Sequence, residues 1–347
     1  MLPYRMRSLT EALCSPPCAG RKPGTPEGRA ARALVTDALR GAGLDPFEQE
    51  VPGCNGANVL AQIPGDSDRY VLVGAHFDHL GKVGKSVYWG ADDNAAAVAI
   101  LVSVAETLAA SRPKGRGVIL AAFDGEEPPY FLSDGMGSER FAQKPPVPLT
   151  SIDMMVCMDL VGHALGGEGL PASVRSSLFA LGAEKSSGTG AHIDAIARSE
   201  PGVLVRRADA EIVPRLSDYA PFWSRAVPFV FLTSGRSRYY HTPEDTPEKL
   251  DYGKMEATAR WLDRFVRETC ERPEDRVSFL RDAVDDASTL RSVADLLEPL
   301  CAFSSQAAQG RSRAQELLKA CDKEGRLPRS RRAEAQMLVG MLESSLA

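Results

Sequence analysis

The sequence predicts an α/β protein in which a mostly parallel, mixed sheet is flanked by helices, with a helical extension at its C-terminal end. Two observations predict this fold class. Short apolar runs of strand length recur along the first two thirds of the chain, and a nearly continuous apolar segment at 94–108 has the length of a buried helix. Strands that alternate with helices are typical of a sheet covered by helices. The expected strands are 58–63, 70–75, 117–123, 154–158, 203–207 and 229–232.

Two flanking regions complete the predicted organisation. A helix is expected over 25–39, because Thr25 is a suitable cap, Pro26 fits the first turn, and glycines follow at 41 and 43. From about residue 273 the chain is rich in Leu, Ala, Arg and acidic residues, with apolar side chains three and four positions apart. We therefore divide the chain into a main domain, residues 1–272, and a helical C-terminal extension, residues 273–347, which carries no chemical motif.

The composition disfavours several classes of protein. The chain has 347 residues, of which 44% are hydrophobic, and its 41 basic residues are spread among 46 acidic ones, so a nucleic-acid partner is not expected. The longest uncharged, strongly apolar stretch, 95–105, is well short of the roughly 20 residues that span a bilayer, so no membrane partner is expected either. The start of the chain does not resemble a secretory signal, and the seven cysteines form no CxxC pair. A cytoplasmic protein with free thiols is expected; the oligomeric state is left open.

Residues that can bind a metal ion follow four of the expected strands. In an open α/β sheet, ligands bind in the crevice at the carboxyl ends of the strands, so side chains far apart in sequence converge there. Asp93 adds a further carboxylate at the start of the expected buried helix. The four sequences are His76-Phe77-Asp78 after the run at 70–75, Asp124-Gly125-Glu126-Glu127 after 117–123, Asp159 after 154–158, and Tyr240-His241 shortly after 229–232.

The types and number of these residues predict two metal ions. Imidazoles together with carboxylates suit zinc and also tolerate manganese or cobalt. Five protein ligands are too many for one tetrahedral zinc ion, but they suit two ions about 3.5–4 Å apart that share a carboxylate. Asp93 is the best candidate for the shared ligand. The residues therefore predict two divalent metal ions per chain, with zinc as the expected metal, held by His76, Asp93, Glu127, Asp159 and His241.

Two neighbouring residues fit supporting roles at such a centre. Asp78 lies two residues after His76 in an extended segment, where its carboxylate can orient the free ring nitrogen of a histidine ligand. The pair Glu126-Glu127 makes sense if one carboxylate binds metal while the other takes a proton from water. Such a general base contributes about 10²–10⁴ to the rate.

Five short motifs, in this order and at these intervals, resemble the co-catalytic zinc aminopeptidase family, which includes bacterial leucyl aminopeptidases and glutamate carboxypeptidase. The motifs are HFD, GADDN, GEE, MDLVG and YYHTPEDT, and the resemblance covers about residues 57–251. It implies the three-layer zinc exopeptidase fold for the main domain. It also implies a hydrolase that removes the N-terminal residue of a peptide or small amino-acyl substrate by means of a zinc-activated water.

The resemblance assigns the individual ligands. One metal would be held by His76, Asp93 and Asp159, and the other by Asp93, Glu127 and His241. It further implies a cis peptide bond between the shared aspartate and the residue after it.

The same resemblance assigns the catalytic groups. Glu126 would be the general base, and Tyr240 would donate a hydrogen bond to the oxyanion that forms during hydrolysis.

Three alternatives remain open. Glutaminyl cyclases use the same scaffold with one zinc, but they usually carry serine where Asn94 follows the shared aspartate here. A carboxypeptidase would need a cationic grip on the substrate carboxylate, for which Arg236 and Arg238 are candidates, although a solvated loop suits both better. A binding module that is not an enzyme would have lost metal ligands, whereas all five are present.

Several other polar residues are given structural roles. His79, His163 and His192 lack a ligand-type setting and are interpreted as structural histidines. Asp92 is expected to be a solvated neighbour of the shared ligand. The segment 128–136, PPYFLSDGM, departs from the family pattern as an insertion, and we expect it to line the substrate side of the site.

Overall fold

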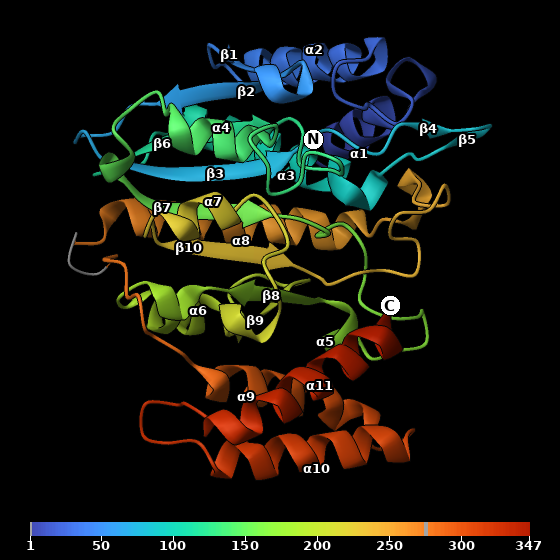
Figure 1. Cartoon of the computed structure of the whole chain (residues 1–347), viewed down its shortest axis with the longest axis vertical. Coiled ribbons are helices and arrows are strands. Elements are labelled where there is room, and N and C mark those ends of the chain that lie inside the picture. Colours follow the sequence, from blue (N-terminus) through green and yellow to red (C-terminus); the bar gives the residue numbers. More distant parts are fainter. Residues whose placement is uncertain (1, 274–276) are drawn as a thin grey trace.

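The protein is built around one mixed sheet of eight strands (Figure 1). Its structure, a computed structural model, describes residues 2–273 and 277–347. The strand order is β1-β2-β6-β3-β7-β10-β8-β9, and β6, β3, β7 and β10 run parallel to one another at its centre. The strands are β1 (Phe47–Val51), β2 (Gly56–Ile63), β3 (Tyr70–His76), β6 (Gly117–Phe123), β7 (Ile152–Met158), β8 (Ser177–Leu181), β9 (Leu204–Ala208) and β10 (Phe229–Thr233).

This sheet confirms the predicted fold class and all six expected strands, and it adds two strands that the sequence pattern did not reveal. β1 has the sequence FEQEV and lies at the sheet edge with most of its side chains wholly or partly exposed, so it lacks an apolar run. β8 is only five residues long and pairs antiparallel with β10. Strand β1 therefore lacks the apolar run that reveals a buried strand, whereas β8, SLFAL, is buried and mostly apolar but too short to give a clear periodic signal.

Helices cover both faces of the sheet because side chains alternate along each strand. Val71, Val73 and Val118 face one apolar cluster, whereas Leu72 and Ile119 face another. The first cluster packs against α1, α2, α3 and α8, and the second packs against α4 and α7. The helices of this part are α1 (Leu2–Leu13), α2 (Pro26–Gly41), α3 (Ala96–Ala110), α4 (Gly137–Gln143), α5 (Ala172–Arg175), α6 (Thr189–Ile196), α7 (Ala220–Ser224) and α8 (Tyr252–Glu271).

The most apolar helix is buried between the sheet and other helices. The segment Ala91–Ala110 is long and apolar enough to cross a membrane by composition alone, but 72% of its most apolar window is buried inside the protein, as in a core helix.

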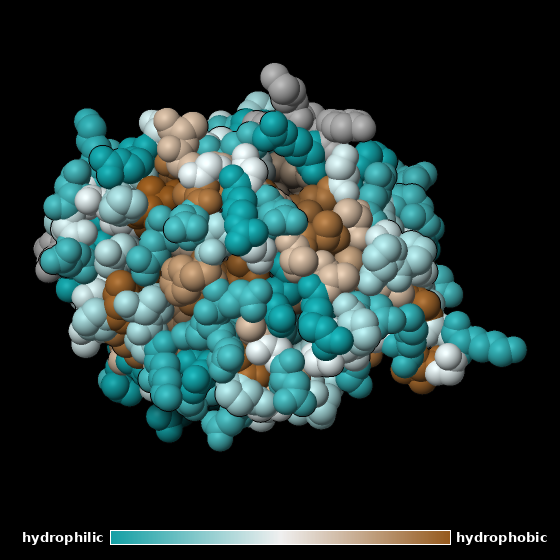
Figure 2. Space-filling view, turned by 90° about the horizontal axis from the view of Figure 1, so that it is seen from above, coloured by the Kyte–Doolittle hydropathy of each residue, from teal (hydrophilic) through white to brown (hydrophobic). Residues whose placement is uncertain are grey.

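The helix predicted over 25–39 is α2, and the Thr25 side chain accepts a hydrogen bond from the Gly28 N–H as its cap. Seen from above, the surface over this end of the molecule is mostly hydrophilic, with apolar residues in separate areas (Figure 2).

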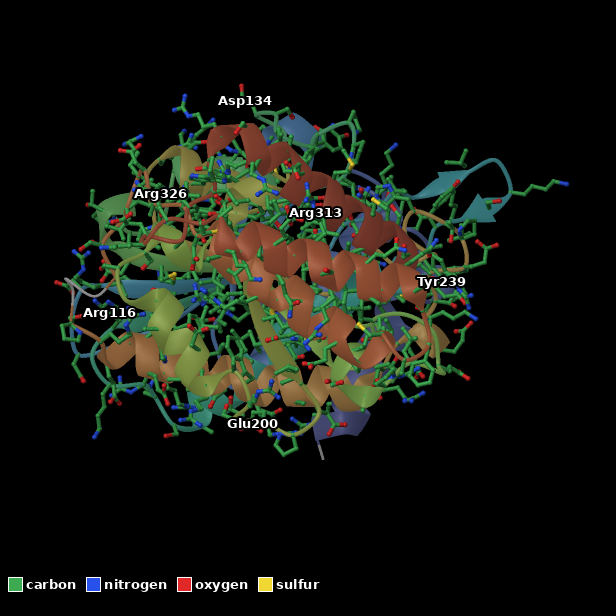
Figure 3. The ribbon with its side chains drawn as sticks, turned by 90° about the horizontal axis from the view of Figure 1, so that it is seen from below. Arg116, Asp134, Glu200, Tyr239, Arg313 and Arg326 are labelled. Atoms are coloured by element: carbon green, nitrogen blue, oxygen red, sulfur yellow. The ribbon has the colours of Figure 1, made fainter. Side chains whose placement is uncertain are left out.

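The C-terminal part is helical and packs at the β9 end of the sheet (Figure 1). It comprises α9 (Asp286–Leu297), α10 (Ser305–Lys319) and α11 (Arg329–Leu346). Residues 274–276, directly after the predicted domain boundary, lie outside the described residues. Figure 3 shows α10 and α11 across the lower end of the molecule, with Arg313 between them. Arg313 of α10 pairs with Glu334 of α11.

Candidate metal centre

The loops that follow the four central strands meet at one edge of the sheet, because β6, β3, β7 and β10 are adjacent and parallel. His76 is the last residue of β3, and Asp159 directly follows β7. The five-residue π-type turn Ala91–Ala95, just before α3, carries Asp93. The structure thus brings side chains that are up to 165 residues apart in sequence, from His76 to His241, into one cluster.

One group of metal-capable atoms surrounds the ring of His76. His76 Nε2 lies 3.4 Å from Asp93 Oδ1 and 3.5 Å from Asp159 Oδ1. All three side chains are buried, and their ligand atoms lie within 4.8 Å of one another. Burial lowers the pKa of His76, but the nearby carboxylates of Glu126 and Asp159 outweigh it and raise that pKa well above its ordinary value. A cluster so negative that it would hold a proton on a buried imidazole also attracts a divalent cation.

A second group lies on the other side of Asp93. His241 Nε2 is 3.2 Å from Asp93 Oδ2 and 3.2 Å from Glu127 Oε2. Asp93 therefore contacts both groups, one through each carboxylate oxygen, as a shared ligand must. Within the described residues, His76 Nε2 and Asp159 Oδ1 are buried without a hydrogen-bond partner, so the donor set fits metal ions.

His79 belongs to this second group, which its interpretation as a structural histidine did not anticipate. One ring nitrogen of His79 and one carboxylate oxygen each of Asp93 and Glu127 lie within 4.8 Å of one another. The Nδ1 atom of His79 is 2.7 Å from Glu127 Oε1. Its Nε2 is buried without a partner among the described residues. Because its Nδ1 holds one oxygen of Glu127, the other oxygen is turned toward His241. The available signal was its place three residues after His76 in the sequence HFDH.

Asp78 supports the centre mainly by holding the backbone N–H groups of Glu126 and Glu127 with its carboxylate. Its carboxylate accepts hydrogen bonds from the N–H groups of Glu126 (3.0 Å) and Glu127 (3.2 Å). We expected that carboxylate to orient His76, but its Oδ1 is 3.6 Å from His76 Nδ1, which is too long for a hydrogen bond. The Asp78 carbonyl oxygen is closer to that nitrogen, at 3.3 Å. Asp78 thus positions the Glu126-Glu127 pair as well as the imidazole.

The backbone around Asp93 is held from two sides. The Asp93–Asn94 peptide bond is cis, as the resemblance implied. Asp245 accepts hydrogen bonds from the N–H groups of both Asp92 and Asp93, so it supports this turn rather than His241. The buried guanidinium of Arg21 donates to the carbonyls of Phe77, Trp89, Gly90 and Asp93. No sequence pattern pointed to Arg21, which reaches the site from the segment before α2.

The expectation that Asp92 is a solvated neighbour is wrong. Only 2% of Asp92 is exposed. Its Oδ1 accepts hydrogen bonds from the N–H groups of Gly162 and His163, and its Oδ2 lies 2.6 Å from His163 Nδ1. A buried carboxylate needs such partners, because desolvation without them is costly. Asp92 and the structural residue His163 therefore join the Asp93 turn to the loop after β7.

Lys254 of α8 lies behind this loop and provides a test of the buried polar network. Its Nζ donates to the His163 carbonyl (2.8 Å) and to Ser234 Oγ (2.7 Å), and burial lowers its pKa to about 8. The unfolded chain, with an ordinary pKa near 10.5, binds more protons than the folded one between these values. The free energy of unfolding should therefore rise between pH 8 and 10, by up to about 1.4 kcal/mol per pH unit from this group.

Replacing Lys254 with methionine should remove this contribution. We expect Lys254→Met to be less stable at pH 8 by about 1–3 kcal/mol, because it leaves two buried acceptors unpaired. The difference in the free energy of unfolding between the wild type and Lys254→Met should widen toward pH 10, because only the wild type gains stability as the pH rises. Urea unfolding at pH 8, 9 and 10 measures it, and a difference that stays constant or narrows would show that Lys254 is not deprotonated on this scale.

Tyr240 lies beside the centre. Its ring stacks on that of His241, with centroids 3.9 Å apart and 17° between the planes. Burial raises its pKa, and the carboxylates of Asp93 and Glu127 raise it further, so the hydroxyl keeps its proton. The adjacent Arg236 forms an ion pair with Glu343 of α11, at 2.8 Å. Arg236, one of the two candidate cations of the carboxypeptidase alternative, is thus paired with a carboxylate of the protein itself.

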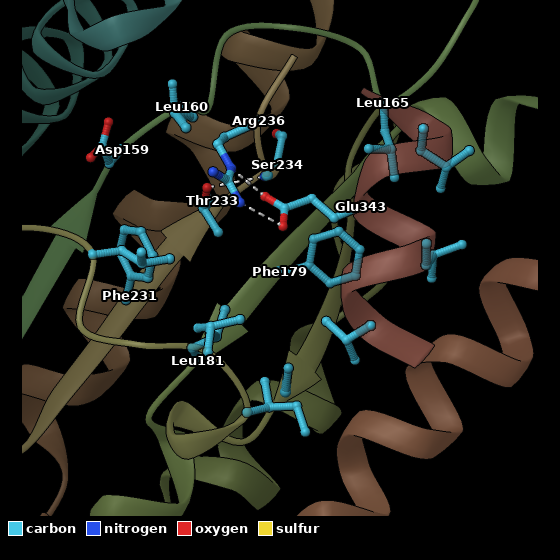
Figure 4. A pocket seen from close by; sticks show the side chains of 18 of the residues that line it. Asp159, Leu160, Leu165, Phe179, Leu181, Phe231, Thr233, Ser234, Arg236 and Glu343 are labelled. Atoms are coloured by element: carbon cyan, nitrogen blue, oxygen red, sulfur yellow. Dashed lines mark hydrogen bonds and ion pairs between the residues drawn. The ribbon is translucent and has the colours of Figure 1, made fainter. Parts of the chain in front are cut away.

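An apolar pocket opens beside the centre (Figure 4). Asp93, Glu126 and Asp159 border it together with Tyr240 and His241. None of the residues 128–136 lines it, so the expectation that this insertion forms its substrate side is not met there. Helices α9 and α11 line it instead.

The sheet, its connections and the buried histidine and carboxylate groups at the strand ends are those of a metal-dependent enzyme. The profile of peptidase family M28 matches residues 58–266, and the chain belongs to this family. All of the metal-capable side chains of the centre, from His76 to His241, lie inside the matched region.

The chain is similar in sequence to proteins that carry different names. The protein YfbL of Escherichia coli K12 is 28% identical over 243 residues, covering 64% of this chain and 74% of YfbL. The glutaminyl-peptide cyclotransferase of Boiga irregularis is 27% identical over 294 residues, covering 72% and 77% of the two chains. The chain is thus similar both to a protein of no stated activity and to a cyclotransferase.

Solved structures share the fold. The glutaminyl cyclase of Porphyromonas gingivalis has a TM-score of 0.61 and 19% identity, covering 77% of this chain and 98% of its own. The LapA aminopeptidase of Legionella pneumophila has a TM-score of 0.63 and 15% identity, covering 78% and 72%. A Zn-dependent exopeptidase of Parabacteroides distasonis has a TM-score of 0.59 and 18% identity, covering 76% and 97%. At these identities the likeness concerns the fold.

Proposed function

We propose that the protein is an aminopeptidase that uses two zinc ions to hydrolyse the N-terminal peptide bond of peptides. The observation that carries this proposal is the position of Asp93. Its two carboxylate oxygens face two different histidines, with Asp93 Oδ1 3.4 Å from His76 Nε2 and Oδ2 3.2 Å from His241 Nε2. A carboxylate shared in this way suits a two-metal site better than a single tetrahedral one.

The residues around Asp93 would hold the ions in two sets. His76, Asp93 and Asp159 form the first set, and Asp93, Glu127 and His241 form the second, with His79 fixing the orientation of Glu127. Zinc supplies an activated water, by lowering its pKa from 15.7 toward about 7, and polarises a carbonyl group. The protein must then move protons and stabilise charge.

Glu126 is placed to move the proton. It belongs to neither of the metal-capable groups found among the described residues, yet its Oε2 is 3.8 Å from His76 Nε2. It is only 6% exposed, and the N–H of its own backbone is held by Asp78. Glu126 would take a proton from the attacking water and return it to the departing amine, while the Tyr240 hydroxyl donates a hydrogen bond to the oxyanion.

The direction of attack can be tested with one peptide in two forms. We expect the zinc-loaded protein to release the N-terminal leucine of a free tripeptide such as Leu-Gly-Gly and to leave its N-acetylated form intact. The reason is that a free amine can be recognised by the buried carboxylates of the centre, whereas an acetylated one cannot. Product analysis by mass spectrometry measures both. Cleavage of the acetylated peptide from its C-terminal end would instead establish a carboxypeptidase.

Cyclisation is the second candidate, because the cyclotransferase of Boiga irregularis aligns with 72% of this chain. A cyclase would convert a peptide with N-terminal glutamine to the pyroglutamyl form and release ammonia, without adding water. The same assay with Gln-Gly-Gly separates the two reactions. We expect free glutamine as the product, and ammonia release with an intact peptide chain would replace the aminopeptidase proposal.

A further inference from the structure

The apolar pocket beside the metal centre is closed by the C-terminal extension. Its volume is about 180 Å³, and it extends from the carboxylates of the centre to helices α9 and α11. Phe179 and Leu181 of β8 line it, and in Figure 4 Phe179 lies beside a helix of the extension. The extension contributes Val293 and Leu296 from α9, and Val339, Leu342 and Leu346 from α11.

The size of the pocket suits a large apolar group. A cavity of about 150 Å³ lined by Leu, Ile and Phe accommodates benzene, so about 180 Å³ is room for an aromatic ring or a branched aliphatic side chain. Phe179, Leu181 and Phe231 supply apolar surface from the sheet side, opposite the aliphatic side chains of the helices. A methyl group would leave most of this space unfilled.

At the end of the pocket formed by the helices, the polar groups of the wall are engaged within the protein. Ser292 Oγ donates to the Arg207 carbonyl at 2.6 Å, and Thr289 Oγ1 accepts from the Asp209 N–H at 2.8 Å. Arg236 and Glu343, both on the wall, neutralise each other. A charged side chain that entered this end would lose hydration without gaining a partner, which is costly. The chemistry of the wall therefore selects against charge.

The wall is fixed to the main domain. Arg332 of α11 reaches Asp286 of α9 at 3.0 Å and Glu211 at 3.1 Å, so one guanidinium joins both helices to the loop after β9. Leu296 is fully buried in the apolar cluster shared by the extension and the main domain. The profile of the family ends at residue 266, before either helix begins. This part of the pocket is a feature of this chain outside the matched region.

We propose that helices α9 and α11 form a specificity-determining wall, and that the enzyme prefers substrates whose N-terminal residue has a large apolar side chain, such as phenylalanine or leucine. The substrate amide then lies at the metal centre while the side chain occupies the pocket that the extension closes. The inference rests on the proposed aminopeptidase function for its reaction, but the binding of an apolar side chain is separable from hydrolysis.

Neighbouring residues of α11 provide a matched pair of variants. Leu342 lines the pocket, whereas Met341 is 63% exposed and does not. Leu342→Trp should fill the pocket, and Met341→Trp adds the same side chain outside it. The measurement is kcat/KM for the 4-nitroanilides of phenylalanine, leucine and alanine, with the thermal midpoint of each variant as a check on folding.

We expect the wild type to favour the phenylalanine and leucine substrates over alanine by at least tenfold, in line with the 10–200-fold that an added methylene can provide. Leu342→Trp should reduce this preference at least tenfold, and Met341→Trp should leave it within twofold. If Leu342→Trp proves unstable, Leu342→Ala should instead raise the relative rate for the tryptophan anilide. A wild type without preference, or equal losses on all substrates, would overturn the proposal.

Binding separates this inference from the proposed function. Titration calorimetry of the zinc-loaded wild type and Leu342→Trp with L-phenylalanine and with L-alanine requires no turnover. If no anilide is cleaved but phenylalanine binds the wild type at least tenfold more tightly than Leu342→Trp, the aminopeptidase proposal fails and the apolar wall stands. If phenylalanine and alanine bind the wild type equally, the wall is contradicted whatever the activity.

Discussion

Replacing Glu126 with glutamine is expected to lower kcat on a leucyl peptide by about 10²–10⁴-fold while both zinc ions stay bound. Glutamine keeps the size of the side chain and the backbone N–H that Asp78 holds, but it cannot take a proton from water. The metal-capable groups do not include Glu126, so their geometry should persist. Steady-state kinetics and zinc analysis of the same preparation measure the two effects together.

A suitable control lies on the loop that carries His241. Glu244 is exposed, three residues after that histidine, and Glu244→Gln makes the same chemical change outside the centre. Its kcat should stay within twofold of the wild type. If Glu126→Gln retained wild-type kcat, Glu126 would not be the base, and loss of zinc from Glu126→Gln would instead make it a ligand.

Replacing Asp93 with alanine is expected to abolish activity and to reduce the zinc content at both positions. Its carboxylate contacts the histidine of each group, so its removal takes one ligand from each ion. Removing Asp159, which contacts only His76 among these histidines, should release one ion and leave the other. Plasma mass spectrometry of dialysed protein measures zinc per chain, and circular dichroism checks the fold.

These two variants discriminate between shared and separate sites. We expect two zinc ions per chain in the wild type, about one per chain in Asp159→Ala, and less than one per chain in Asp93→Ala. Two full equivalents retained in Asp93→Ala would show that this carboxylate is not shared, and the two-metal arrangement would have to be abandoned.

The central strands were predictable because they are buried on both faces. A strand such as β6, GVILAAF, is fully buried, so a continuous apolar run reveals it. Strand β1 could not be predicted, since it lies at the sheet edge and carries two glutamates and a glutamine. The helices of the extension were indicated by apolar spacing, but nothing in that spacing showed that α9 and α11 would line the pocket beside the metal centre.

The metal centre was predictable to the extent that its metal-capable residues belong to short motifs at strand ends. His76, Asp93, Glu127, Asp159 and His241 converge because parallel strands deliver them to one edge. Long-range supports were not predictable. Arg21 and Asp245 act on backbone groups, and Asp92 is buried by a loop 70 residues away, so their roles depend on tertiary contacts that leave no local pattern. His79 was undervalued because a single histidine is usually structural.

The presence of two cations around Asp93 is tested most directly by anomalous diffraction at the zinc edge from crystals of the zinc-loaded protein. The account predicts two peaks about 3.5–4 Å apart at the carboxyl ends of β3 and β7, one on each side of Asp93. One peak, on the His76 side or the His241 side alone, would contradict the two-metal mechanism and favour a single-zinc enzyme. No peak at this edge of the sheet would contradict the metal centre altogether.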